Sequence, residues 1–198
     1  MSTAVVSTLT NTGSGLSDLE LLDQFTNGDS SGLDELFRRY RTVAYRVAYR
    51  LLGNEADALD AVQDGFVNAL THLPRFRGHS SFKTWLLRIV SNAALDLGRS
   101  RRRREARSGH PLIDDPGPMD ELPPPDAGLE RADLRQMLDQ ALATLPLAQR
   151  QTFVLHVDGG LTYREVAEAL GISIGTVMSR LFYARQRLKA ELTDKVNA

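Results

Sequence analysis

The chain has 198 residues, a formal net charge of −1 and no cysteine, which excludes a disulfide framework, thiolate metal ligands and a cysteine nucleophile. No apolar run approaches the ~20 residues of a membrane span, and residues 1–16 lack the basic start and apolar core of a signal peptide. We therefore expect a cytoplasmic protein without membrane insertion. Aromatic residues make up only 7% of the chain and no alternating β-branched run stands out, which favours an all-α fold.

The near-neutral total conceals blocks of opposite charge. Residues 99–107 hold six arginines and one glutamate, whereas residues 108–130 hold six acids and neither lysine nor arginine. Such blocks indicate separate surfaces for separate partners.

The first part of the chain predicts a disordered tail over residues 1–16, followed by a four-helix domain over residues 17–104. Ser17 and Glu20 have the spacing of a capping box and open a short helix. Three further helices are predicted at about 31–52, 54–73 and 81–104. The inward positions predicted for the second helix are Leu33, Leu36, Phe37, Tyr40, Val43, Ala44, Val47 and Leu51.

The third and fourth helices carry contrasting surfaces. Acids follow one face of the third helix, whose central Gly65 costs about 1 kcal/mol relative to alanine and so predicts a close approach by a neighbour. The inward positions predicted for the fourth helix are Phe82, Trp85, Leu86, Ile89, Val90, Ala93 and Leu97.

A linker is predicted over residues 105–128. The stretch 105–130 contains six of the eight prolines together with the six acids. Such a composition buries too little apolar surface to offset its ordering entropy, so we expect a flexible, extended tether.

The last part of the chain, residues 129–198, predicts a second four-helix domain. Helices are expected at about 129–145 and 146–157. Thr162 and Glu165 then form a second capping box, Gly171 ends that helix, and Ser173 caps the last one. Two short helices joined by a glycine-containing turn are typical of a helix-turn-helix.

The last helix carries small polar and basic residues away from its apolar stripe, as a helix in a DNA major groove requires. The alternative is an ordinary helical hairpin with a solvated face. No acid lies between Ser173 and Lys189, which favours DNA binding.

The first domain carries three further signals, each with an ordinary alternative. The arginine block suits phosphate contact, or it only complements the dipole of a helix end. The loop 75–80 places cations beside Phe76, which suits an unstacked base, although Phe76 and Trp85 are equally suited to the core. The acidic face suits a basic protein partner, or it is merely solvated.

No catalytic site is evident. The four histidines show no metal-ligand spacing, and the sequence has neither a phosphate-binding loop nor a nucleophile elbow. We expect neither an enzyme nor a bound metal or cofactor.

Three ordered motifs resemble bacterial sigma factors of the extracytoplasmic-function (ECF) group, over about residues 17–195. The first motif is Arg50–Gly53 with Asp57–Phe66. The second is Phe76–Gly78, Ser81–Leu86 and Arg88–Ile89. The third is Leu145–Pro146, Arg150, Tyr163–Ala167, Gly175–Val177 and Ser179–Arg180.

The resemblance implies a monomeric transcription initiation factor that binds core RNA polymerase, through its β′ clamp helices and β flap, and promoter DNA. An anti-sigma factor is expected as a further partner. The residues implied in clamp binding are Asp57, Asp60, Gln63 and Asp64. Those implied in reading and melting the −10 element are Arg75, Phe76, Arg77, His79, Lys83, Arg88, Asn92, Asp96, Arg99, Arg101, Arg102 and Arg103. Those implied at the −35 element are Arg164, Ser173, Thr176, Met178, Ser179, Arg180, Tyr183 and Arg187.

The chain departs from the family pattern at three positions. Leu59 replaces a usual acid, Gly65 is unusual within its helix, and Met178 stands where a basic residue is frequent. The competing hypothesis is a stand-alone helix-turn-helix regulator, which would normally dimerise on palindromic sites. No obvious dimer face supports it. An RNA-binding module is a weaker alternative, because the sheet aromatics of such folds are absent.

Overall fold

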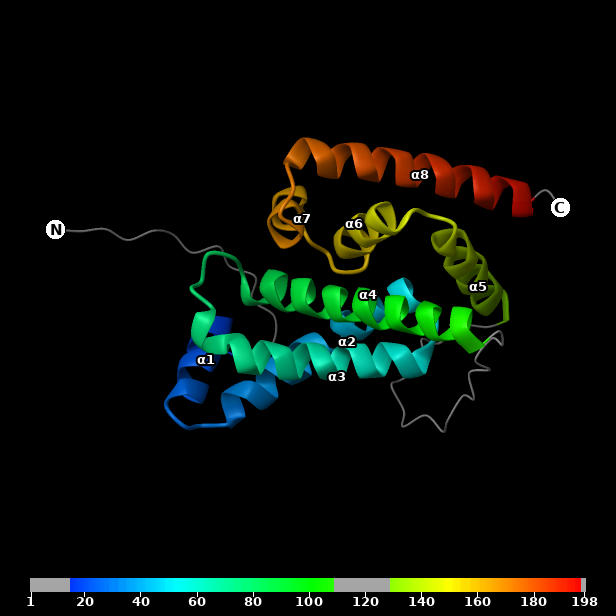
Figure 1. The fold of residues 1–198 in the computed structure, drawn as a ribbon. Helices are drawn as coiled ribbons and strands as arrows, with labels where there is room; N and C mark the ends of the chain where they lie inside the picture. Colours follow the sequence, from blue (N-terminus) through cyan, green and yellow to red (C-terminus); the bar gives the residue numbers. More distant parts are fainter. Residues whose placement is uncertain (1–14, 109–128, 197–198) are drawn as a thin grey trace. The chain divides into compact units, whose positions relative to one another are not determined.

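The computed structural model describes residues 15–108 and 129–196, and within these ranges all regular structure is helical (Figure 1). The all-α prediction is confirmed. The α-helices are α1 (Asp18–Thr26), α2 (Ser31–Leu52), α3 (Glu55–His72), α4 (Phe82–Ser108), α5 (Leu129–Ala143), α6 (Leu147–Val157), α7 (Tyr163–Leu170) and α8 (Ile174–Val196), with a 3-10 turn, η1 (Leu73–Arg75), after α3. The described residues divide within α2 into two compact units, one ending at Arg39 and the other beginning at Tyr40.

Two predicted helix ends are wrong. The fourth helix does not stop at residue 104 but continues to Ser108, so the predicted linker start at 105 lies inside α4. Arginine is a good helix former, and Glu105 pairs with Arg101 one turn earlier at 2.8 Å, which stabilises this extension. Conversely, α5 ends at Ala143 rather than 145, because Pro146 disfavours helical geometry in the residue before it. Most of the predicted tail and tether, residues 1–14 and 109–128, lies outside the described residues.

The first unit contains α1 and the beginning of α2. The predicted capping box at its start is confirmed: the Ser17 hydroxyl accepts from the Glu20 amide at 3.3 Å, and the Glu20 carboxylate accepts from the Ser17 amide at 2.6 Å. Arg39 of α2 bonds Asp18 at 2.5 Å and so ties the two helices together. The prediction that Phe37 faces inward is wrong, since its side chain is 44% exposed.

In the second unit, α3 and α4 run side by side (Figure 1) and make the most extensive helix pair among the described elements. One face of α3 is apolar and buried, including Ala58, Ala61, Val62 and Phe66. Gly65 explains the close approach, because a Cβ at this position would lie 2.6 Å from Cγ2 of Val90 and 3.1 Å from its Cα. The expectation of close contact at Gly65 is confirmed.

Helix α4 is also buried on a second side that the sequence did not indicate. Thr84, Leu87 and Ser91 lie outside its predicted apolar face, yet all three are buried. Both α6 and α7 contact α4. The polar members of this second side are buried because they have hydrogen-bonding partners there.

The helix-turn-helix forms as predicted. Thr162 and Glu165 make the capping box, and Gly171 adopts the left-handed conformation with φ of 64° after α7. The apolar stripe of α8 is buried, and part of it packs with α5 in a cluster whose buried members are Ala141, Leu142, Leu145, Ala184 and Leu188.

Replacing Gly65 with alanine is expected to lower the free energy of unfolding by about 1–3 kcal/mol. The added methyl would force α3 and α4 apart, and overpacking of this kind exceeds the ~1 kcal/mol gained in helix propensity. Urea denaturation of the full chain measures the difference. Gly175→Ala is the matched control, because its added Cβ meets only the Ser173 hydroxyl at 3.8 Å. A Gly65→Ala protein as stable as the wild type would contradict this account of the packing.

Candidate nucleic-acid interface

The acidic face of α3 is exposed, with one exception. Asp60, Gln63 and Asp64 are exposed, and neither carboxylate takes part in an ion pair within the described residues. Asp57 differs, because it is half-buried, accepts from the Asn54 side chain at 2.9 Å and pairs with Arg101 at 3.0 Å. The structure therefore brings three of the four predicted polymerase-binding residues together on an open surface.

In the arginine block at the end of α4, some arginines form ion pairs with acids and others are exposed. Arg101 is paired with Asp57 and Glu105, and Arg99 with Asp96 at 3.2 Å. Arg102 and Arg103 are exposed. The sequence predicts all four as −10 contacts, but the pairing of Arg101 with Asp57 arises only from the packing of α3 against α4.

The loop before α4 contributes Phe76 to an aromatic cluster. The ring centroid of Phe76 lies 5.0 Å from that of Trp85 and 6.0 Å from that of Phe82. Phe76 is only half-buried, and three residues close to it in the chain are exposed: Arg75, Arg77 and His79. Phe76 thus packs within the cluster while part of its ring remains accessible.

The outer face of α4 meets α6 and α7 through polar groups. Gln151 donates from Nε2 to the Ser91 hydroxyl at 3.3 Å and to Oδ1 of Asn92 at 3.5 Å. The Thr84 hydroxyl donates to Glu165 at 3.3 Å. Of the predicted residues on this helix, Lys83 is half-buried, whereas Arg88, Asn92 and Asp96 are exposed.

The carboxylate of Glu165 serves two elements at once. Burial alone would raise its pKa, but hydrogen bonds from the Thr162 amide and hydroxyl and from Thr84, together with the charge of Lys83, lower the pKa below its ordinary value. The same carboxylate therefore caps α7 and links α7 to α4.

Arg50, near the end of α2, is bonded to two acids of the C-terminal helices. Its guanidinium contacts Asp139 of α5 and lies 3.5 Å from Asp158, which follows α6. Burial raises the pKa of Asp158, although the charge and hydrogen bond of Arg50 oppose this shift. Arg50 therefore supplies the counter-charge for a half-buried acid.

The predicted DNA-facing residues gather on α7 and the first half of α8. Exposed members are Arg164, Ser173, Met178, Ser179, Tyr183 and Arg187, whereas Thr176 and Arg180 are half-buried. Part of the hydroxyl set is used within the helix, since Ser173 accepts from the Thr176 amide at 3.1 Å and Ser179 donates to the Thr176 carbonyl at 3.0 Å.

An exposed apolar strip crosses this surface, and two of its residues, Ile174 and Phe182, are not among the residues predicted from the sequence. Ile174, Met178 and Phe182 follow one another at intervals of four residues, and the last two are 55% and 62% exposed. The four-residue spacing was the available signal. Apolar side chains in a major groove contact thymine methyl groups.

Two parts of the chain match known protein families: residues 36–104 match sigma-70 region 2, and residues 135–188 match sigma-70 region 4. The chain belongs to the sigma-70 family. It is 31% identical to the ECF RNA polymerase sigma-E factor of Escherichia coli K12 over 178 residues, covering 87% of this chain and 93% of that protein. It is 36% identical to the ECF RNA polymerase sigma factor SigE of Mycolicibacterium smegmatis over 165 residues, covering 82% of this chain but only 63% of that relative's length.

Two solved structures are similar in fold. CnrH in complex with the cytosolic domain of CnrY has a TM-score of 0.68 at 28% identity and covers 89% of this chain and 97% of its own. The sigma factor RpoE of Bartonella quintana, in complex with the anti-sigma factor NepR, has a TM-score of 0.64 at 27% identity, covering 80% and 97%.

These matches identify an ECF sigma factor, a transcription initiation factor, and do not favour the stand-alone regulator. Members of this family are non-catalytic. Among the helices of residues 15–108 and 129–196, none combines the length and apolar character needed to cross a membrane.

Replacing Arg50 with alanine is expected to lower the free energy of unfolding at pH 7 by about 1–3 kcal/mol, because Asp158 would lose its counter-charge while remaining half-buried. The deficit should shrink as the pH falls through the raised pKa of Asp158, since the neutral carboxyl needs no partner.

Urea titrations at several pH values measure this difference. Arg38→Ala is the control: Arg38 bonds Glu35 at 2.8 Å, but its side chain is 63% exposed, so its loss should change stability by less than about 0.5 kcal/mol. Equal deficits for the two variants would contradict the role assigned to Arg50.

Proposed function

We propose that this sigma factor binds core RNA polymerase through region 2 and reads the −10 and −35 promoter elements with regions 2 and 4. The supporting observation is that two surfaces of opposite character occur in one chain. The α3 helix has an exposed acidic face, and the helix-turn-helix has no acid from Ser173 to Lys189. Acids repel DNA, so the α3 face suits a basic protein surface.

For the polymerase, we assign the exposed trio Asp60, Gln63 and Asp64 to the β′ clamp helices. Asp57 is included in the same site as a supporting residue, because its carboxylate is held by Asn54 and Arg101. Region 4 is assigned to the β flap. The exposed Leu59, in the middle of this face, offers an apolar contact where the family usually has an acid.

For the −10 element, we assign the loop Arg75–His79 to an unstacked base and the exposed face of α4 to the adjoining strand. Phe76 is half-buried and lies between Arg75 and Arg77 in the chain, which suits stacking with a base. Exposed arginines of α4, among them Arg88, Arg102 and Arg103, suit phosphates.

For the −35 element, we assign the start of α8 and Arg164 of α7 to the major groove. Arg180 suits a base edge or a phosphate, while Met178 replaces a charge with an apolar contact.

Reading both elements at once requires the chain to open. The −10 and −35 elements are about 25 base-pair steps apart, or ~85 Å on B-form DNA. The 27 residues of α4 span only about 40 Å, and α6 and α7 contact this helix directly. The hydrogen bonds of Gln151 and Glu165 with α4 must therefore break before a promoter is bound at both elements.

Regulation by an anti-sigma factor is proposed on the basis of the similar structure of RpoE, which was solved with NepR. We propose that this chain binds such a partner and is a monomer when free. We also propose that it is located in the cytoplasm and has no catalytic activity.

The test is co-elution of the purified full chain with core RNA polymerase, followed by run-off transcription from genomic fragments. A one-to-one complex that starts transcripts at discrete sites is expected. Failure to bind core polymerase, with tight dimeric binding to a palindrome, would overturn the proposal in favour of a stand-alone regulator.

Reversing the charge of Asp60 or Asp64 with arginine is expected to weaken polymerase binding at least about tenfold, because like charges would then face each other across the interface. Fluorescence titration with core polymerase measures the affinity. Asp23→Arg, an exposed acid on α1, is the charge-matched control. Unchanged affinity of both α3 variants would reject the clamp assignment.

Replacing Arg180 with alanine is expected to weaken promoter binding by about 1–3 kcal/mol if the residue reads a base. Binding of the polymerase complex to a promoter and to a version with a scrambled −35 element distinguishes the two roles. A loss confined to the intact element indicates a base contact, whereas an equal loss on both DNAs indicates a phosphate contact.

A further inference from the structure

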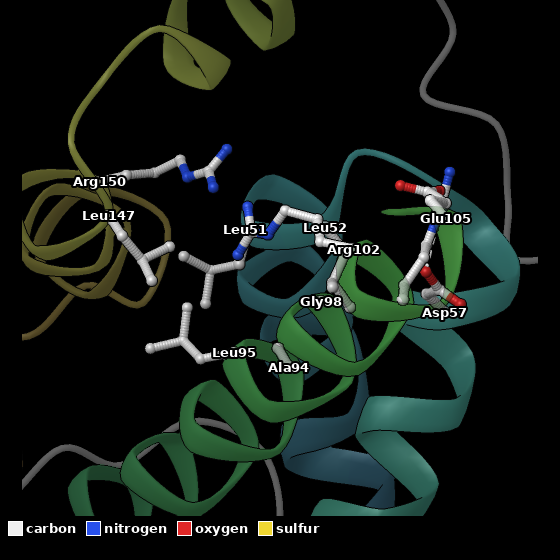
Figure 2. Close-up of a pocket in the computed structure, with 11 residues that line it drawn as sticks. Leu51, Leu52, Asp57, Ala94, Leu95, Gly98, Arg102, Glu105, Leu147 and Arg150 are labelled. Carbon is white, nitrogen blue, oxygen red and sulfur yellow. Dashed lines mark hydrogen bonds and ion pairs between the residues drawn. The ribbon is translucent and has the colours of Figure 1, made fainter. Parts of the chain in front are cut away.

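A cavity of about 200 Å³ lies where α4 meets α6 and the end of α2 (Figure 2). Its walls include apolar side chains from each of these three helices: Leu51 and Leu52 of α2, Leu95 of α4 and Leu147 of α6. Three arginines also line it. Figure 2 shows the guanidinium of Arg150, from α6, on the same side of the cavity as that of Arg102, from α4.

The three arginines differ in their pairing. Arg101 is neutralised by Asp57 at 3.0 Å and Glu105 at 2.8 Å, and both of these acids also line the cavity. Arg102 and Arg150 have no acidic partner within the described residues, and the buried Nε of Arg150 has no hydrogen-bond partner. Burial and, secondarily, the charge of Arg102 lower the pKa of Arg150.

The proximity of these two guanidinium groups is unfavourable. A buried donor without an acceptor carries its full desolvation cost, and two guanidinium groups near each other repel. An anion between them would relieve both effects. Guanidinium groups bind phosphate oxygens in bidentate geometry, which also satisfies the donors.

We propose that this cavity binds a phosphate group, as inorganic phosphate or as a small phosphate monoester, between Arg102 and Arg150. The volume supports a small ligand, because pockets for drug-sized molecules occupy about 300–1,000 Å³.

Such a ligand would also join two helices. Arg102 belongs to α4 and Arg150 to α6, so a phosphate bound to both arginines would favour the arrangement in which these helices are in contact. Phosphate binding itself concerns the free chain and does not depend on the proposed roles in promoter reading.

The experiment is a thermal-unfolding titration of the free full chain with inorganic phosphate, at constant ionic strength maintained with sodium chloride. A saturable rise in the unfolding midpoint is expected for the wild type and for Arg107→Gln, an exposed arginine of α4 that does not line the cavity. Arg150→Gln and Arg102→Gln should each weaken the apparent affinity at least about tenfold.

The Arg102→Gln variant keeps the test valid if Arg150→Gln fails to fold, because Arg102 is exposed and its replacement removes no buried contact of α6. A parallel titration with glycerol phosphate separates the two sources: a monoester that binds more tightly than phosphate identifies the monoester as the ligand, and the reverse identifies the free ion. Equal midpoint shifts in all four proteins, or no saturable shift in the wild type, would overturn the proposal.

Discussion

The burial of α4 on two sides is the constraint on which the second unit depends. On one side, Gly65 lets α3 approach until only the absence of a Cβ prevents a clash with Val90. On the other side, Leu87, Thr84 and Ser91 are covered, and the polar pair is bonded to Glu165 and Gln151. A helix held in this way has its remaining face, and the loop before it, in a defined position.

Internal pairing decides which charges are available to partners. Asp57 and Arg101 neutralise each other, and Arg50 forms ion pairs with Asp139 and Asp158. The charges of these residues therefore stabilise the packing of helices and are less available to binding partners. Asp60 and Asp64 form no ion pair within the described ranges, and both are exposed. Removing one partner of a pair inside the protein leaves the other charge uncompensated, whereas removing an exposed charge changes mainly what the surface attracts.

In the helix-turn-helix, hydroxyl groups likewise form hydrogen bonds within the protein. Ser173 caps α8 through the Thr176 amide, and Ser179 bonds back to the Thr176 carbonyl. These bonds hold the first turns of α8 in shape and leave the hydroxyls with further acceptor or donor capacity. The exposed strip formed by Ile174, Met178 and Phe182 then adds apolar character beside them.

The sequence by itself determined the helical elements, because their signals are local. The capping boxes at Ser17 and Thr162, the stop at Gly171 and the apolar stripe of α8 all act within a few residues, and the structure contains each of them. The resemblance of three motifs to sigma factors likewise needed no structure, and the family matches bear it out.

Only the tertiary structure decided which residues of these helices face another part of the chain. The second buried side of α4 and the pairing of Arg50 and Arg101 involve residues far apart in sequence. The same is true of Arg102 and Arg150, which line one cavity and have no acidic partner among the residues that the structure describes. Helical periodicity reports one apolar face, and it carries no information about a polar face that becomes buried through hydrogen bonds to a distant helix.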